Sequence, residues 1–287
     1  MKNIALLTNY SKDKDLDYTR MIAEYIIEKG GDYWLPERIG GDEVDDEEHY
    51  DLSSMPDNID CVLALGGDGT LLKVAREMFE KGIPVLGINL GTLGFLTSAE
   101  RGELPQCLDS LFDDSYTIEE RMMLRGTAYH GDEKIMENVA LNDIIVARSG
   151  FSRLVELKIY VNGELLSVYG ADGVIISTPT GSTGYSLSAG GPIVFPKTDV
   201  MIISPICPHS LQARSIVVSG TDRIMIEIGK RRKTQKEEAM VTFDGRIAEE
   251  LETGDRIEVY KAQETTQLIR LKGQSFYQTL RNKIGNV

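Results

Sequence analysis

The fold is decided by one stretch of sequence, Asp60-Cys61-Val62-Leu63-Ala64-Leu65-Gly66-Gly67-Asp68-Gly69-Thr70. Its apolar run is too short for a helix and is bounded by turn residues, which is typical of a strand buried on both faces. The glycines that follow carry no Cβ, so their backbone can adopt positive φ and approach a ligand closely. The apolar pattern that starts at Leu71 predicts a helix directly behind them. Because N–H groups at a helix N-terminus bind anionic oxygens, the stretch predicts a phosphate site.

A carboxylate stands in the middle of this loop. Asp68 lies where phosphate would bind, and phosphate repels a carboxylate unless a cation or a proton transfer accompanies it. This favours a phosphoryl-transfer site. The structural alternative is that Asp68 only caps the helix, since Asp is a common N-cap residue. No Gly-Lys-Ser/Thr follows four residues on, so the loop is not a Walker loop.

The composition is that of an ordinary globular protein with a strong acidic excess. The chain has 287 residues and a net charge of −14, which argues against a nucleic-acid partner, because such binding needs surplus Lys and Arg. Its three cysteines, Cys61, Cys107 and Cys207, are too widely spaced for a disulfide framework, which favours a reducing compartment. No apolar stretch approaches membrane-spanning length. We therefore expect a cytoplasmic protein with no membrane partner.

The first part of the chain alternates strand and helix patterns. The predicted elements, in order, are a strand at 4–7, a helix at 18–29, a strand at 61–65, a helix at 71–81, a strand at 83–88 and a helix at 103–111. This order predicts a doubly wound, Rossmann-like α/β domain, which binds ligands at the carboxyl ends of its strands. The acidic segment 40–51 is interpreted as an exposed loop, and its role is open.

From about Tyr116 the pattern changes to short β-rich runs separated by turn residues, the last two of them at 256–260 and 267–271. Many strands at this spacing predict an antiparallel β-sandwich, and Asn162-Gly163 predicts a hairpin turn within it. The tail at 275–283 has a helical pattern, and we expect it to pack on the first domain. The expected domains are therefore 1–118 with 273–287, which is α/β, and 119–272, which is β-rich and carries dinucleotide binding and oligomerisation.

Three further segments carry polar residues where ordinary turns do not require them. Gly87–Thr97 combines close-approach glycines with one exposed aromatic residue, Phe95. The pair Asn142-Asp143 lies within an apolar run, where polar groups are costly unless they have partners or a ligand. Ala171–Pro192 is rich in Ser, Thr and Gly. Taken one at a time, each segment is better interpreted as a turn whose side chains bond their own backbone.

Taken together, these residues strongly resemble the NAD kinase family. The family pattern of Gly-Gly-Asp-Gly-Thr, Leu-Gly-Phe-Leu, Asn-Asp/Glu, Asp-Gly and Thr-Pro-Thr-Gly-Ser-Thr occurs in order between residues 66 and 192. The resemblance continues through Ser204–Leu211 and Phe243–Arg246, so it covers nearly the whole chain. The Thr-Gly-Ser-Thr segment is the most specific part, whereas Gly-Gly-Asp-Gly-Thr is shared with diacylglycerol and sphingosine kinases.

The resemblance implies an activity. Family members transfer a phosphoryl group from ATP, or in some cases polyphosphate, to the 2′-hydroxyl of the adenosine ribose of NAD, giving NADP. The resemblance implies that Asp68 is the catalytic base. It also implies a divalent cation, Mg²⁺ or Mn²⁺, which would neutralise the phosphates and for which Asp68 is the candidate protein contact. Family members are typically homodimers or homotetramers, so the same assembly is expected here.

The resemblance also assigns binding residues. Donor phosphates would contact Gly66, Gly67, Gly69 and Thr70. Lys73 and Arg153 match positions that are commonly basic in the family and would meet phosphates, whereas Arg246 replaces a glutamine seen in some members. Asn142 and Asp143 would hold the adenosine hydroxyls. The rest of the dinucleotide site would be lined by Asp172 and by Thr183, Gly184, Tyr185, Ser186, Leu187 and Ser188, with Phe95 also at the site.

The chain departs from the family pattern at two positions. Gly184 replaces the usual Ala, and Gly170 stands where many bacterial members have Arg, a charge that Arg246 would supply instead. Two other functions remain open at this point. A lipid kinase of the diacylglycerol type shares the first motif, and a non-catalytic dinucleotide sensor shares the binding residues. An assay of NADP formation from NAD separates them.

Overall fold

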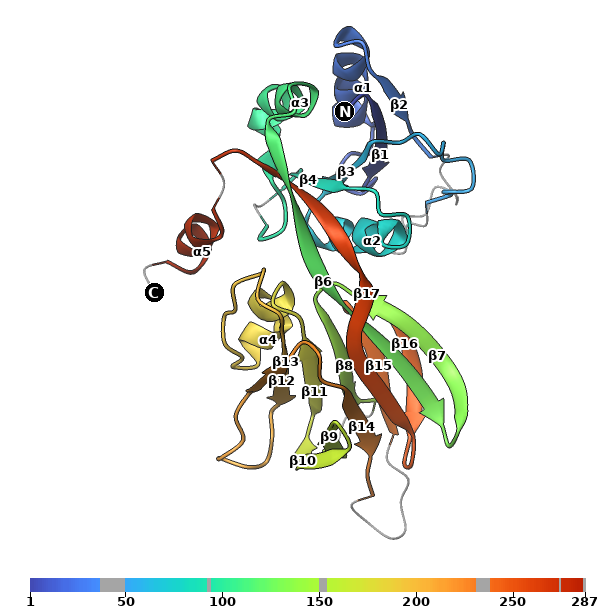
Figure 1. The fold of residues 1–287 in the computed structure, drawn as a ribbon, viewed down its shortest axis with the longest axis vertical. Coiled ribbons are helices and arrows are strands. Elements are labelled where there is room, and N and C mark those ends of the chain that lie inside the picture. The colour runs from blue at the N-terminus through green and yellow to red at the C-terminus, as the bar shows by residue number, and fades with distance from the viewer. Residues whose placement is uncertain (37–49, 92–93, 150–153, 231–237, 274, 286–287) are drawn as a thin grey trace. The chain divides into compact units, whose positions relative to one another are not determined.

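The computed structural model describes residues 1–36, 50–91, 94–149, 154–230, 238–273 and 275–285. It divides into two compact units (Figure 1). The first unit is Met1–Glu120 together with Thr266–Val287, and the second unit is Arg121–Thr265. The sequence places the domain boundaries after residues 118 and 272, whereas these units divide after residues 120 and 265. The domain assignment itself stays a prediction.

The first unit is built on a parallel sheet whose strands lie in the order β4-β3-β1-β2, with β5 pairing β4. The strands are β1 Asn3–Thr8, β2 Asp32–Trp34, β3 Cys61–Gly66, β4 Val85–Asn89 and β5 Ala99–Glu100. The helices are α1 Asp17–Glu28, α2 Asp68–Met78, the short 3-10 helix η1 Arg101–Glu103, α3 Leu104–Phe112 and α5 Phe276–Ile284.

The helices cover both faces of this sheet. Residues of α1 and α3 pack in one cluster with Leu63 and Leu65 of β3, while α2 contacts β3 and β4 from the other side. All six residues of β3 are buried, as expected for a strand covered on both faces. The predicted α/β class is confirmed, and the glycine-rich loop follows the carboxyl end of β3.

The second unit is a sandwich of two antiparallel sheets. One sheet has the order β13-β12-β11-β8-β15-β16. Its strands are β8 Asp143–Arg148, β11 Gly173–Ser177, β12 Val200–Ile206, β13 Ile216–Ser219, β15 Glu238–Phe243 and β16 Arg246–Glu252. The other includes β6 Tyr116–His130, β7 Glu133–Ala140, β9 Val155–Val161, β10 Glu164–Ala171, β14 Ile224–Ile228 and β17 Arg256–Leu271.

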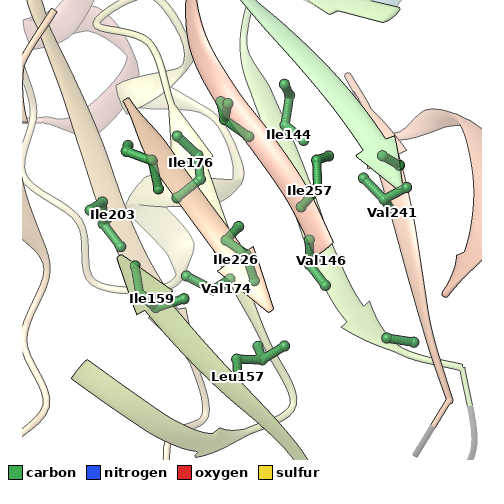
Figure 2. Close-up of a cluster of buried hydrophobic side chains, with 14 of the residues drawn as sticks. Ile144, Val146, Leu157, Ile159, Val174, Ile176, Ile203, Ile226, Val241 and Ile257 are labelled. Carbon is green, nitrogen blue, oxygen red and sulfur yellow. The ribbon is translucent and has the colours of Figure 1, made fainter. Parts of the chain in front are cut away.

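Branched aliphatic side chains from both sheets form the core of the sandwich (Figure 2). Ile144 and Ile176 come from one sheet, and Ile159, Ile226 and Ile257 come from the other. Alternate residues of each strand therefore face inward, which is the pattern that the sequence predicts for a sandwich. Between β11 and β12 lie two short helical segments, η2 Gly181–Thr183 and α4 Tyr185–Ser188.

Several element boundaries differ from the sequence prediction. The helix predicted to start at Leu71 begins at Asp68, so the carboxylate belongs to its first turn. Two predicted strands at 256–260 and 267–271 are one continuous strand, β17, because the polar stretch between them interrupts the apolar pattern and not the backbone. The Asn162-Gly163 hairpin turn is confirmed, with φ of 52° and 83° at these residues. Segment 40–51 lies outside the described residues except for Tyr50 and Asp51.

Candidate active site

The Asp68 carboxylate is held by a second loop of the first unit. Its two oxygens accept hydrogen bonds from the backbone N–H of Phe95, at 2.7 Å, and of Leu96, at 3.1 Å. The N-cap of α2 is Gly67, and no side chain caps this helix. The interpretation of Asp68 as a mere helix cap is therefore wrong, because its carboxylate is oriented by backbone groups far along the chain.

Gly94 makes room for this carboxylate. A Cβ at Gly94 would lie 1.8 Å from one Asp68 oxygen and 2.3 Å from its carboxyl carbon. The same loop is fixed from its other side by Arg270, whose guanidinium donates to the Leu96 carbonyl and to the Ser98 hydroxyl, both at 3.1 Å. Gly94, Phe95 and Leu96 thus form a cradle that fixes the direction of one acid.

The glycines of the first motif do not use the positive φ that the lack of a Cβ allows. None of Gly66, Gly67 and Gly69 has positive φ, and Gly67 is extended, with φ of −151° and ψ of −168°. The reason for glycine at position 66 is steric, because a Cβ there would lie 2.2 Å from the hydroxyl oxygen of Thr70. A Cβ on Gly69 would meet nothing within 4 Å, so this position faces open space.

The three basic residues predicted at the site have different surroundings. Lys73 on α2 is buried, and its ammonium lies 4.1 Å from the ring centroid of Tyr50, which is a cation–π arrangement. Arg246, at the start of β16, is exposed. Arg153 lies outside the described residues. Phe95 is partly exposed, and the Lys283 ammonium of α5 lies 5.7 Å from its ring centroid.

In the second unit, Asp244 holds the backbone of the Asn142-Asp143 pair. Its carboxylate accepts hydrogen bonds from the N–H groups of Leu141, at 3.1 Å, Asn142, at 2.7 Å, and Asp143, at 3.2 Å. Its own N–H donates to the Asp143 carbonyl at 2.9 Å. Asp244 has a left-handed φ of 51°, which Asp tolerates better than most residues. The sequence analysis quoted its motif without assigning it a role.

The Thr-Pro-Thr-Gly segment holds the same pair from the other side. The Thr178 N–H donates to the Asn142 carbonyl at 2.9 Å, and the Thr178 hydroxyl donates to the Leu141 carbonyl at 2.6 Å. A Cβ on Gly181 would lie 2.2 Å from the Asn142 carbonyl oxygen, so only glycine fits there. The side-chain amide oxygen of Asn142 is buried and has no hydrogen-bond partner among the described residues.

The acidity of Asp143 is strongly altered by this setting. Its side chain is 4% exposed, and burial, with a smaller contribution from the charge of Asp244, raises the pKa of the Asp143 carboxyl to about 7. The charged form is disfavoured because the site removes it from water and places a second carboxylate nearby. A perturbed acid beside an unpartnered amide oxygen is a feature of functional sites.

The predicted lining segment divides into packed and accessible residues. Ser186 is buried, and its hydroxyl lies 3.3 Å from that of Ser204. Tyr185 and Ser188 are exposed, and Thr183, Gly184 and Leu187 are partly exposed. A Cβ at Gly184, where the family usually has Ala, would lie 3.2 Å from the Gly181 carbonyl and 3.5 Å from the Asn142 amide nitrogen. Gly184 therefore lies directly beside Asn142.

Two arginines that the sequence analysis missed anchor this region. Arg148, at the end of β8, forms an ion pair of 2.7 Å with the predicted site residue Asp172. Arg121 is buried and donates to the Thr180 hydroxyl at 3.3 Å. Neither arginine lies in a motif that resembles a binding pattern, so nothing in the sequence indicated either contact.

Two models of a known protein family match the chain. The model of the ATP-NAD kinase N-terminal domain matches residues 4–116, and that of the ATP-NAD kinase C-terminal domain matches residues 121–271. The chain belongs to the NAD kinase family. Together the two matches cover both units and every motif from which the family resemblance was stated.

Individual NAD kinases match along their full length. The NAD kinase of Lachnoclostridium phytofermentans is 44% identical over 288 residues, with 100% of each chain covered. That of Thermoanaerobacter sp. is 42% identical over 284 residues, covering 99% of each chain.

Solved structures of the family have the same fold. Yeast NADH kinase, complexed with NADH, matches with a TM-score of 0.78 and 25% identity, covering 99% of this chain and 87% of that one. An NAD kinase from Archaeoglobus fulgidus, in complex with ATP, has a TM-score of 0.75, covering 99% of this chain and 98% of that one, and at 24% identity it supports the fold alone.

Within the described ranges, no three His, Cys, Asp or Glu side chains are grouped so as to hold a metal ion. Of the helices in those ranges, none is both long and apolar enough to cross a membrane.

Proposed function

We propose that this NAD kinase uses Asp68 as the general base that activates the 2′-hydroxyl of the adenosine ribose of NAD. The bond from that oxygen to the terminal phosphorus of ATP forms while the bond to the leaving ADP breaks, and the hydroxyl proton passes to the Asp68 carboxylate. The observation that carries the proposal is the double hydrogen bond from Phe95 and Leu96, which fixes the direction of this carboxylate. Orientation of this kind lowers the barrier to proton transfer.

The Asn142-Asp143 pair is proposed to bind the adenosine hydroxyls. The support is the buried amide oxygen of Asn142, which has no partner among the described residues and suits a hydroxyl donor. A protonated Asp143 carboxyl can donate a hydrogen bond as well as accept one, so the pair offers both kinds of contact. Asp172 and the accessible residues of 183–188 complete the proposed dinucleotide site.

The donor is proposed to be ATP, or polyphosphate, bound with Mg²⁺ or Mn²⁺. The residues fit a cation held chiefly by donor phosphates and water, because Mg²⁺ usually takes only one or two protein carboxylates in such sites. Asp68 is the carboxylate at the glycine-rich loop, and the cation would neutralise phosphate charge there. Activity should therefore vanish in excess chelator and return with Mg²⁺. Full activity in chelator would contradict this part of the proposal.

A homo-oligomer in the cytoplasm is also proposed. The support for assembly is in the second unit, where the outer strand β10 exposes Leu165, Leu166 and Val168, and the outer strand β13 exposes Val217. Unpaired strand edges with apolar side chains are readily covered by a second copy. Light scattering at working concentration tests this, and a fully active monomer would reject it.

The cytoplasmic location is supported by the three free cysteines.

One assay tests the central proposal. Purified protein is incubated with NAD, Mg²⁺ and either ATP or polyphosphate, and NADP is measured with an NADP-specific dehydrogenase. In the Asp68→Asn variant, kcat should fall by about 10²–10⁴-fold, the range for loss of a general base, while NAD affinity changes little. Near-normal turnover by this variant would refute Asp68 as the base. No NADP from the unaltered chain would favour a dinucleotide sensor instead.

A further inference from the structure

A lysine that no sequence motif singles out lies against the glycine-rich loop. The ammonium of Lys12 is 2.8 Å from the place where a Cβ on Gly67 would be, and 3.9 Å from the equivalent place on Gly91. Gly67 directly precedes Asp68, and Gly91 belongs to the loop after β4. The cation therefore lies beside the loops that follow two neighbouring parallel strands, β3 and β4.

The loop that carries Lys12 is tied to the same motif. Asn9, the first residue after β1, donates its backbone N–H to the Leu65 carbonyl at 2.8 Å and its side-chain amide to the Thr70 hydroxyl at 3.3 Å. Its own side-chain oxygen accepts the Lys12 N–H at 3.1 Å. Asn9 thus links the backbone of Lys12 directly to the loop that carries Asp68.

The far side of this loop is fixed by a buried acid. The Asp13 carboxylate accepts the N–H groups of Tyr18, at 3.2 Å, and of Thr19, at 2.9 Å, at the start of α1. It also accepts the Thr19 hydroxyl at 2.7 Å. Lys12 is therefore held between two anchored residues, Asn9 and Asp13, while its own side chain is exposed. No ion pair of Lys12 occurs within the part of the chain that the structure describes.

We propose that Lys12 binds the phosphate oxygens of the phosphoryl donor beside the glycine-rich loop. The inference rests on the proposed function, because it concerns the donor of that same reaction. The chain carries a net charge of −14, so a polyanionic donor needs cations placed close to where it binds. Lys73, which the sequence analysis expected to meet phosphates, is buried against Tyr50. Lys12 is exposed, and its ammonium lies next to Gly67, the residue that precedes Asp68.

The test compares two lysines of one loop. Lys12→Met removes the charge and keeps most of the side chain, and Lys14→Met makes the same change at an exposed lysine two residues away. Binding of Mg·ATP and of inorganic tripolyphosphate is measured by titration calorimetry, without turnover. Lys12→Met should weaken both by about 10- to 100-fold, the range for hydrogen bonds to charged groups, and Lys12→Arg should recover most of the affinity.

The outcomes separate this inference from the proposed function. Unchanged NAD affinity in Lys12→Met, with Lys14→Met equal to the unaltered chain, supports a donor-specific contact. If Lys12→Met binds Mg·ATP within twofold of the unaltered chain, or if it weakens NAD binding instead, the inference is wrong. Both measurements are of binding, so they decide the role of Lys12 even if the chain forms no NADP, a result that would count against the proposed function alone.

Discussion

The two units hold their candidate functional acids in opposite ways. In the first unit, backbone N–H groups of Phe95 and Leu96 bind the Asp68 carboxylate itself. In the second unit, the Asp244 carboxylate binds the backbone around Asn142 and Asp143, and the Asn142 amide oxygen has no partner among the described residues. A fixed side chain suits proton transfer, which is sensitive to small displacements, whereas a fixed backbone with an available side chain suits ligand binding.

The largest effect, a loss of kcat, is expected from a change that displaces the fixed side chain of Asp68. In Gly94→Ala, the new Cβ would meet the Asp68 carboxylate at 1.8 Å, so the acid or its loop must move. A displacement of about 1 Å in a catalytic group costs about 10²-fold, and kcat should fall by that amount with little change in NAD affinity.

The control for this change is Gly102→Ala in the same unit, where a Cβ meets nothing within 4 Å. Steady-state kinetics and thermal unfolding are measured for both variants. If Gly94→Ala keeps its kcat, the cradle does not set the direction of Asp68. The statement that the first unit fixes the side chain of its acid would then be wrong.

A smaller effect, on KM for NAD and not on kcat, is expected when the contacts of Asp244 to the backbone of residues 141–143 are weakened. Asn tolerates the left-handed φ of Asp244, so Asp244→Asn keeps the turn but loses the charge that holds three N–H groups. Since hydrogen bonds to charged groups contribute about 1.5–3 kcal/mol, KM for NAD should rise by about 10-fold or more, while KM for ATP stays constant.

Asp222→Asn is the matched control, because Asp222 also accepts a backbone N–H, from Ser219 at 2.9 Å, in a turn of the same unit. Both variants should lose some stability in urea unfolding. Only Asp244→Asn should change KM for NAD, and equal behaviour of the two would mean that Asp244 has a purely structural role.

The smallest effect is on the pH dependence of stability. The pKa of Asp143 is raised to about 7 by burial and by Asp244, against about 3.9 for an unfolded Asp. The folded state therefore holds its proton more tightly, and the free energy of unfolding should decrease as pH rises from about 4 to about 7. The shift corresponds to a few kcal/mol at most.

The side chain at position 143 of the Asp143→Asn variant cannot ionise, so this part of the pH dependence should disappear. The free energy of unfolding should therefore fall less between pH 5 and pH 8 in the variant than in the parent. Urea unfolding at the two pH values measures it. An unchanged pH profile in Asp143→Asn would show that Asp143 titrates at an ordinary value.

Much of the fold follows from local patterns. The strand at Cys61–Gly66, the helices of the first unit and the Asn162-Gly163 turn are each encoded within a few residues, so periodicity and turn chemistry predict them. β6 was not predicted as a single strand, because its 15 residues mix charged and apolar side chains without strict alternation.

The residues of the candidate site were predicted better than the contacts that position them. Asp68 stands out because a carboxylate interrupts a glycine-rich loop, but nothing local indicates that Phe95 and Leu96 donate to it across 27 and 28 residues. Asp244 acts on Asn142 across 102 residues through the pairing of β8 with β15. Lys12 has no local signal, because a lysine in an exposed loop is common.

The return of β17 to the first unit has a consequence for biosynthesis. Leu268 of β17 pairs with Val85 of β4. Arg270 of β17 donates to the Leu96 carbonyl, and the Leu96 N–H donates to the Asp68 carboxylate. The first 120 residues leave the ribosome well before Thr266 and the residues after it, yet the sheet and the loop that orients Asp68 are completed only by these later residues. A nascent or clipped chain that ends before Thr266 is thus expected to lack full support for the proposed base, so that activity arises only after this part of β17 has been made.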